Sequence, residues 1–238
     1  MPAFASEYQE MLESGGACRG ADGYTAHALP GDEPRFAPDR TALVRHIRLE
    51  VDLDIPNKSI SGVCVTTLEA VAPGLESVVF DAVEMRVGGI TLEGAGTLDY
   101  ESDGGRLRVR LPAPAQPGER FTIRIAYRAT PRRGLYFIGP DEAYPDKPQQ
   151  VWSQGQDEDS RHWFPCLDYP HQKATSEVIA TVPQELFALS NGALVETTQD
   201  HGRGTKTYHW RLDVPHSCYL VTLAAGDFAE IEERGGGV

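Results

Sequence analysis

The sequence lacks the features that place a protein in a membrane or on a secretory route. None of its apolar runs approaches the ~20 residues that a transmembrane helix needs. Its first residues contain no basic segment followed by an apolar core, so no secretory signal is visible. We therefore expect no membrane partner.

Cysteine is also scarce. The 238 residues include four cysteines, and none of them forms a CxxC pair. Cysteines this far apart are typical of free thiols in a reducing compartment, and not of a disulfide framework or a zinc ribbon. The sequence therefore predicts a cytoplasmic protein with thiols at Cys18, Cys64, Cys166 and Cys218.

Familiar catalytic and metal-binding motifs are missing as well. The sequence contains no HExxH zinc motif and no GxSxG nucleophile motif. Residues 202–206 contain two glycines and a lysine but lack the spacing of a phosphate-binding loop. Asp157, Glu158 and Asp159 lack the alternating acids and the glycine of an EF-hand. We predict no catalytic residue, no metal site and no cofactor within this chain.

Positive charge is in the minority. Lysine and arginine number 22 against 35 acidic residues, which gives a formal net charge of -13. Nucleic acid is a poor partner for such a surface, because phosphate binding needs clustered basic side chains. The acidity favours either simple solubility or a cationic partner such as a peptide amino terminus.

Alternation of apolar and polar residues dominates the chain after residue 40. It predicts strands at 43–55 and 121–127 most strongly, and the first is expected to bury Leu43, Arg45 and Ile47 on one face. Further strands are expected at 60–68, 76–81, 83–92, 106–111, 149–153, 175–182, 186–190, 193–198, 205–213 and 218–225. Many short strands with frequent turns indicate an all-β fold, either a saddle-shaped β-sandwich or an open twisted sheet, with few short helices.

Two local signals refine this interpretation. Asn191 and Gly192 between two apolar strands predict a hairpin. Apolar residues at helical spacing in 3–14 predict one short amphipathic helix before a Gly- and Pro-rich lead-in. We divide the chain into an N-terminal extension at 1–40, a β-domain at 41–228 and the start of a linker at 229–238.

The most informative stretch is 151–170. It places two amides, Gln154 and Gln156, around Gly155, and then combines acids with aromatic residues and prolines. One interpretation is a packed loop whose aromatic rings fill the edge of a sandwich. The other is a recognition loop, in which Gly155 lets the backbone approach a ligand and the amides supply donors and acceptors.

Isolated polar residues carry weaker signals. No histidine lies at ligand spacing to another, so His162, His171 and His216 are predicted to be hydrogen-bonding loop residues. Asp168 is predicted to cap the turn at Tyr169 and Pro170.

The same segments carry a family resemblance that covers roughly 35–228. The pattern Trp-Ser-Gln-Gly-Gln at 152–156 and the pattern Arg-His-Trp-Phe-Pro-Cys-Leu-Asp at 161–168 are its strongest parts. Other matching stretches are 35–41, 46–52, 133–137, 173–175, 188–192 and 219–228. With these, the chain resembles the N-terminal domain of zinc aminopeptidases of the aminopeptidase N and leukotriene hydrolase family, the gluzincins.

The resemblance implies a β-saddle that packs on a thermolysin-like zinc domain. That domain, with its GxMEN and HExxH motifs, is expected to begin after residue 228, so the chain alone is expected to be an inactive fragment without zinc. Gln154, Gly155 and Gln156 are implied to bind the first residue and the free amino group of a peptide. The peptide bond between Gln156 and Asp157 is implied to be cis.

Gln156 departs from the commoner family pattern, which has Glu there, and agrees with the leukotriene hydrolase pattern. Two alternatives follow: a noncatalytic interaction module built on the same fold, and part of a leukotriene-hydrolase-like bifunctional enzyme.

Overall fold

The computed structural model describes residues 38–229 and 231. The expected helix at 3–14 and nearly all of the lead-in lie outside these residues, as does most of the expected linker after 228. The described part is almost all strand, with two short 3-10 helices, η1 (Ser160–His162) and η2 (Cys218–Leu220). No helix in this part is both long and apolar enough to cross a bilayer.

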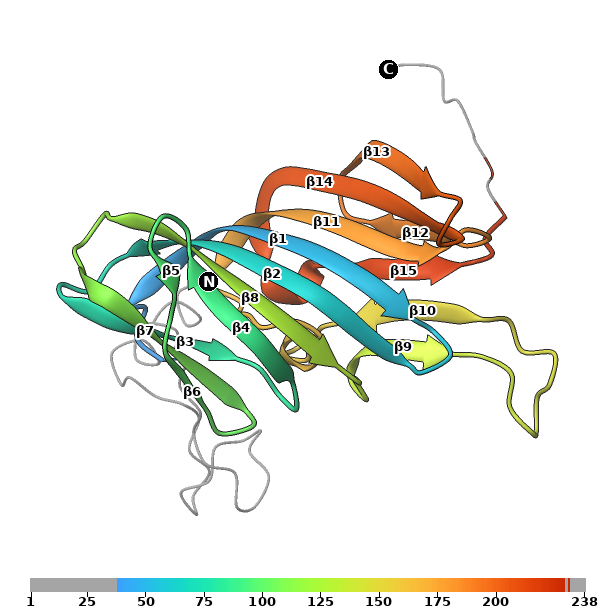
Figure 1. Ribbon diagram of the computed structural model, residues 1–238, viewed down its shortest axis with the longest axis horizontal. Helices are drawn as coiled ribbons and strands as arrows, with labels where there is room; N and C mark the ends of the chain where they lie inside the picture. The colour runs from blue at the N-terminus through green and yellow to red at the C-terminus, as the bar shows by residue number, and fades with distance from the viewer. Residues whose placement is uncertain (1–37, 230, 232–238) are drawn as a thin grey trace, which may run out of the picture. The chain divides into compact units, whose positions relative to one another are not determined.

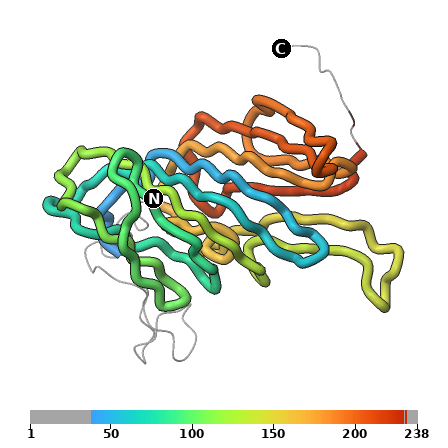
Figure 2. The backbone as a smooth tube through the Cα atoms, viewed as in Figure 1, coloured from blue at the N-terminus to red at the C-terminus, as the bar shows by residue number. Residues whose placement is uncertain are grey.

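Fifteen strands form three sheets (Figures 1 and 2). An eight-stranded sheet has the order β13-β14-β11-β1-β2-β8-β4-β5, a four-stranded sheet the order β12-β15-β10-β9, and a three-stranded sheet the order β3-β7-β6. The strands are β1 (Ala42–Asp54), β2 (Ser59–Ala70), β3 (Leu75–Asp81), β4 (Arg86–Leu92), β5 (Gly96–Thr97), β6 (Tyr100–Ser102), β7 (Arg106–Ala115), β8 (Arg120–Ala129), β9 (Gly134–Ile138), β10 (Gln150–Gln154), β11 (Lys173–Pro183), β12 (Phe187–Ser190), β13 (Ala193–Asp200), β14 (Thr205–Ser217) and β15 (Leu223–Gly226). The all-β prediction is confirmed.

The large sheet is antiparallel except at its centre. There β1 and β11 run parallel, with Leu49 opposite Val178. Figure 1 shows these two strands side by side, although more than 100 residues separate them in the sequence. The connection between them includes the three-stranded sheet, strands β9 and β10 of the four-stranded sheet, and the 151–170 loop.

The predicted alternation in β1 is right from Ile47 onward and wrong before it. Ala42 and Val44 are buried, whereas Leu43 is half-buried and Arg45 is exposed. The pairing of β1 with β2 shifts register between Val44 and His46. This bulge inserts one residue and so reverses which face the earlier residues point to.

The predicted hairpin at Asn191 and Gly192 is also wrong. The turn exists, and Gly192 has φ +88°, but β12 pairs with β15 while β13 pairs with β14 in another sheet. The Asn191 Oδ1 accepts a hydrogen bond from the Thr222 backbone N–H at 2.7 Å. A Cβ on Gly192 would lie 1.9 Å from the Arg211 carbonyl oxygen. These contacts, with residues distant in the sequence, hold the turn at which the chain leaves the four-stranded sheet and enters the large sheet.

The strand expected at 218–225 is shorter than its alternation suggested, because Cys218–Leu220 form η2 and β15 begins at Leu223. Side chains bind the backbone at the start of β15: Asn191 accepts from the Thr222 N–H, and the Ser153 Oγ accepts from the Leu223 N–H at 2.8 Å. The short strands β5, β6 and β9 were not predicted.

The core lies between the large sheet and the elements that pack on its inner face. Tyr208 and Trp210 of β14 point inward and donate hydrogen bonds to the carbonyls of Leu186 and Ala188 at 3.3 and 2.9 Å. Phe187 packs edge-on against Tyr208 with ring centroids 4.9 Å apart. These contacts attach the four-stranded sheet, and therefore the end of β10, to the large sheet.

Candidate functional site

The candidate site begins where β10 ends. Gln154 is the last residue of β10 and pairs with Gly134 of β9, and a turn at 156–159 then leads into η1. Gln154 and Gln156 are exposed, and Gly155 between them is buried. No hydrogen bond joins either side-chain amide to another described residue. The peptide bond between Gln156 and Asp157 is cis, as expected. Both amides are thus accessible to a ligand.

The burial of Gly155 has a cause within the chain. A Cβ at this position would lie 2.6 Å from the Tyr219 carbonyl oxygen and 2.7 Å from the Ser160 Oγ. The Gly155 carbonyl accepts from the Asp159 N–H at 2.9 Å, and the Ser160 hydroxyl donates to the Cys218 carbonyl at 3.3 Å. The missing side chain therefore lets the loop lie directly on η2, and contact between Gly155 and a ligand stays a prediction.

A second glycine holds the other side of the turn. Gly134 has φ +74°, a left-handed conformation that favours glycine. A Cβ there would lie 2.0 Å from the Asp159 carbonyl oxygen and 3.0 Å from the Trp163 ring. The turn at 156–159 is thus fixed between β9 and η2. The sequence singled out neither Gly134 nor Ser160 for this role, because both partners are distant in the chain.

The aromatic residues of the stretch divide into two groups. Trp163 and Phe164 are fully buried and meet edge-on, with ring centroids 4.5 Å apart. Trp152 is 42% exposed and stacks on Tyr136 at 4.7 Å. The packed-loop interpretation therefore describes Trp163 and Phe164, while the exposed amides and Trp152 remain available for recognition.

Asp168 binds Arg161 of η1 and does not cap the turn at Tyr169 and Pro170, so its predicted role is wrong. Its Oδ2 accepts from the Arg161 backbone N–H at 3.0 Å and from the Arg161 Nε at 3.2 Å. Its own N–H donates to the Asp81 Oδ2 at 3.1 Å, and Arg161 also lies 3.5 Å from Asp81. Burial raises the pKa of Asp168 to about 6, against the opposing effect of Arg161. This network ties η1 to the end of β3.

The outer face of the four-stranded sheet is apolar beside the loop. Strand register puts Leu189 opposite Ala224, Ala224 opposite Trp152, and Trp152 opposite Tyr136. Leu189 and Trp152 are 43% and 42% exposed. This apolar row (Leu189, Ala224, Trp152, Tyr136) crosses all four strands two residues before Gln154.

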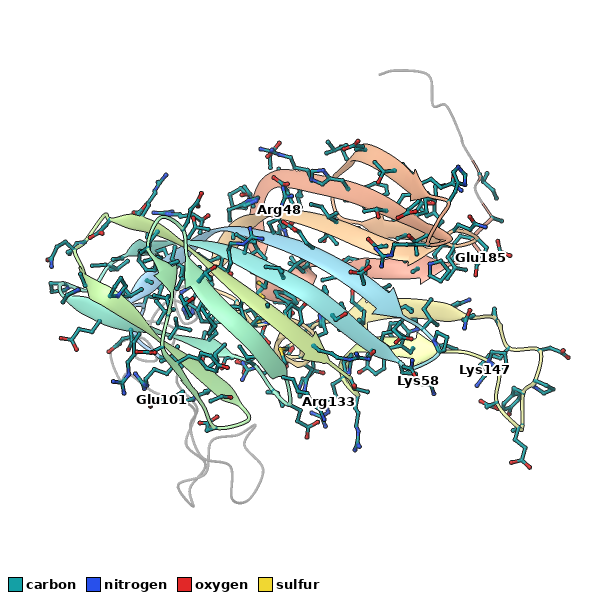
Figure 3. The ribbon with its side chains drawn as sticks, viewed as in Figure 1. Arg48, Lys58, Glu101, Arg133, Lys147 and Glu185 are labelled. Carbon is teal, nitrogen blue, oxygen red and sulfur yellow. The ribbon has the colours of Figure 1, made fainter. Side chains whose placement is uncertain are left out.

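A different polar cluster lies on the outer face of the large sheet. Glu177 of β11 accepts from the Arg48 Nη1 at 3.1 Å and from the His209 Nε2 at 2.9 Å, and Arg211 and His46 lie 3.4 and 3.5 Å away. Figure 3 shows Arg48 on β1 at this sheet. The carboxylate joins three strands and needs no ligand to explain its charge balance.

The three histidines singled out from the sequence, His162, His171 and His216, act as hydrogen-bonding or packing groups. His162 lies 3.6 Å from Asp159, and His171 stacks on Tyr169 at 5.7 Å. His216 belongs to β14 and not to a loop, and its Nε2 lies 2.8 Å from the Ser176 Oγ. Burial lowers the pKa of all three.

A metal ion has one candidate location among the described residues. The ligand atoms of Cys166, Asp168 and Cys218 all lie within 4.8 Å of one another, and all three residues are buried. Cys218 is distant from Cys166 and Asp168 in the sequence, so the sequence gave no sign of this cluster. It contains no histidine and differs from a zinc peptidase site in its ligands.

Comparison with known proteins gives a consistent result. The model of the peptidase M1 N-terminal domain family matches residues 43–220. Aminopeptidase B from Rattus norvegicus is 30% identical over 136 residues, which are 57% of this chain and 20% of the relative. Transcription initiation factor TFIID subunit 2 from Danio rerio is 30% identical over 138 residues, which are 55% of this chain and 12% of the relative.

Solved structures agree with these matches. An M1 zinc metallopeptidase variant from Deinococcus radiodurans, bound to a Tyr-Ser-Ala substrate, superimposes with a TM-score of 0.67 at 27% identity. The match covers 79% of this chain and 43% of that one. The chain therefore spans less than half the length of the metallopeptidase and about a fifth or less of the curated relatives.

Proposed function

The chain belongs to the peptidase M1 N-terminal domain family, and from this we propose that it is the substrate-recognition domain of a zinc aminopeptidase. The observation that carries the proposal is the pair of exposed amides, Gln154 and Gln156, on a turn fixed by two glycine contacts. A peptide amino terminus is an ammonium group that needs acceptors, and each amide carbonyl offers one.

Gln156 is the residue we assign to the ammonium group. A neutral amide accepts from an ammonium but contributes no full charge, and hydrogen bonds with an ionised partner are about twice as strong as neutral ones. The remaining neutralisation would come from acidic groups outside this chain. Gln154 and the backbone at Gly155 would contact the first residue of the peptide.

The apolar row is the face we assign to a catalytic domain of the same polypeptide. Exposed apolar surface beside polar recognition residues marks interaction sites. A domain seated on Leu189, Trp152 and Tyr136 would close over the end of β10 and bring its zinc to the peptide held by Gln156. Zinc would polarise the scissile carbonyl and activate water there. The zinc peptidase motif is absent from this sequence, so its catalytic step lies outside the chain.

The test is Gln156→Ala in the full-length protein, assayed on peptides with a free amino terminus. Loss of a hydrogen-bond partner at a desolvated site costs about 1–3 kcal/mol, which corresponds to a fall of roughly 5- to 150-fold in kcat/KM. Gln199→Ala, at an exposed glutamine on β13, is the matched control and should leave kcat/KM unchanged. Unchanged kinetics in Gln156→Ala would refute the assigned role.

A noncatalytic assembly role is the second candidate, and the match to a transcription factor subunit favours it. The two candidates differ in the residues that follow the domain. A downstream HExxH and turnover of aminoacyl substrates by the purified full-length protein support the peptidase. Their absence supports the assembly role. Leukotriene-type epoxide hydrolysis rests on Gln156 alone and is tested by adding an epoxide substrate to the same assay.

A further inference from the structure

We propose that Cys166, Cys218 and Asp168 form a buried binding site for one soft, thiophilic metal ion of the d10 type, such as Cu⁺, Zn²⁺ or Cd²⁺. The site is independent of the proposed peptidase function, because it lies under the loop and takes none of its ligands from Gln154 or Gln156.

Geometry is the first support. Cys166 and Asp168 come from one segment and Cys218 from another, 50 residues later in the sequence, and the ligand atoms of all three lie within 4.8 Å of one another. In a tetrahedral thiolate site with metal–sulfur bonds of about 2.3 Å, neighbouring sulfurs are about 3.8 Å apart. A contraction of about 1 Å or less would therefore close the three ligands around an ion.

The surroundings are the second support. Cys166, Asp168 and Cys218 are each at most 3% exposed. Arg161 contacts Asp168 and Asp81 in this part of the structure. A coordinating thiol is deprotonated, so a bound cation would balance the charge of the two thiolates.

An unsatisfied phenol is the third support. The Tyr127 hydroxyl is buried and has no hydrogen-bond partner among the described residues. A buried polar atom without a partner indicates a missing water or ion. A metal ion or its bound water within reach of the phenol would satisfy it.

The choice of ion follows from the ligands. Thiolates select Cu⁺ and Zn²⁺ over Mg²⁺ and Ca²⁺, which prefer oxygen. A closed structural zinc site has four ligands. This buried cluster offers three, so it suits an ion that accepts a lower coordination number. The fold would gain a crosslink between the segment after η1 and η2, and η2 is the element that Gly155 and Ser160 contact.

The experiment adds Cd²⁺ to the purified, reduced chain. We expect one equivalent to produce a thiolate-to-metal absorption band, and native mass spectrometry to show one bound ion. Cys218→Ala and Cys166→Ser should each weaken Cd²⁺ binding by at least about tenfold. Cys64→Ser is the matched control, a buried thiol outside the cluster that donates to the Pro165 carbonyl at 3.3 Å. It should keep the band.

Mg²⁺ serves as a second control, since nonspecific binding to an acidic surface would not need sulfur. The proposal is overturned if the wild-type chain shows no thiolate band at one equivalent of Cd²⁺, or if the band persists in both cluster variants. Should those variants not fold, cadmium NMR of the wild type decides: a resonance in the sulfur-ligand range supports the site, and an oxygen-only shift refutes it.

Discussion

Gly155 and Tyr219 meet backbone to backbone, with room for a hydrogen atom but not for a methyl group between them. A Cβ on Gly155 would come within 2.6 Å of the Tyr219 carbonyl oxygen and 2.9 Å of its Cα. Neither atom belongs to a flexible side chain that could move aside. This contact sets the distance between the recognition loop and η2.

Gly155→Ala is therefore expected to lower the free energy of unfolding by about 1–3 kcal/mol, the usual range for overpacking a closed site. Urea denaturation of the isolated chain measures it. Gly89→Ala is the control, because a Cβ on Gly89 meets nothing within 4 Å and the change should stay within about 0.5 kcal/mol. Equal effects of the two substitutions would show that the Gly155 contact is unimportant.

The isolated chain is expected to hydrolyse no aminoacyl chromogenic substrate, with or without added zinc. Peptide hydrolysis of the proposed kind needs a metal ion that activates water, and its ligand motif is absent from the sequence. A rate above the uncatalysed background, retained through purification, would contradict the assignment of a recognition domain.

Trp152→Ser tests the apolar row. In the isolated chain the cost should stay near the about 0.5–1.5 kcal/mol that an aromatic pair contributes, because Trp152 is 42% exposed and stacks on Tyr136. In the full-length protein the loss of unfolding free energy should be larger, since a docked domain would bury the ring. Val195→Ser, at a 55% exposed residue on β13, should cost the same in both proteins. The docking face is wrong if Trp152→Ser also costs the same in both.

The histidine contribution to stability should fall as the pH drops below about 6.5, the ordinary pKa of histidine. Asp168, whose pKa is raised by burial to about 6, contributes with the opposite sign over the same range, because the folded chain binds its proton more tightly. Burial lowers the pKa of His46, against the opposing charge of Glu177, and it lowers the pKa of His216. A lowered pKa means that the unfolded chain binds protons more tightly, so the contribution is fully present above the unfolded pKa and is lost on acidification.

Urea midpoints at about pH 7.5 and about pH 5.5 measure this effect. His216→Gln should reduce the difference between the two midpoints. His201→Gln, at an exposed residue in the turn before β14, should leave the difference as in the wild type. A change in midpoint between the two pH values that is the same in His216→Gln as in the wild type would exclude His216 as a contributor.

Local pattern was sufficient for the fold class and for most strands. Alternation identified the central strands because one face of each meets the core and the other meets solvent, as at Ile47, Leu49 and Val51 in β1. It failed where a bulge changes the phase, as at Arg45, and where a side chain binds the backbone in place of a strand partner, as at Thr222.

The sequence by itself also determined the candidate residues, because two amides around a glycine form a pattern that composition alone does not produce. Only the tertiary structure decided what each residue does. In the structure, Gly155 is buried against Tyr219 and Cys166 lies close to Cys218. Asp168 binds Arg161 and does not cap the turn. The contacts of Gly155 with Tyr219 and of Cys166 with Cys218 join residues more than 50 positions apart in the sequence, and no local spacing encodes them. Burial then assigned the roles, since the same glycine, acid or thiol has a different chemistry once water is excluded.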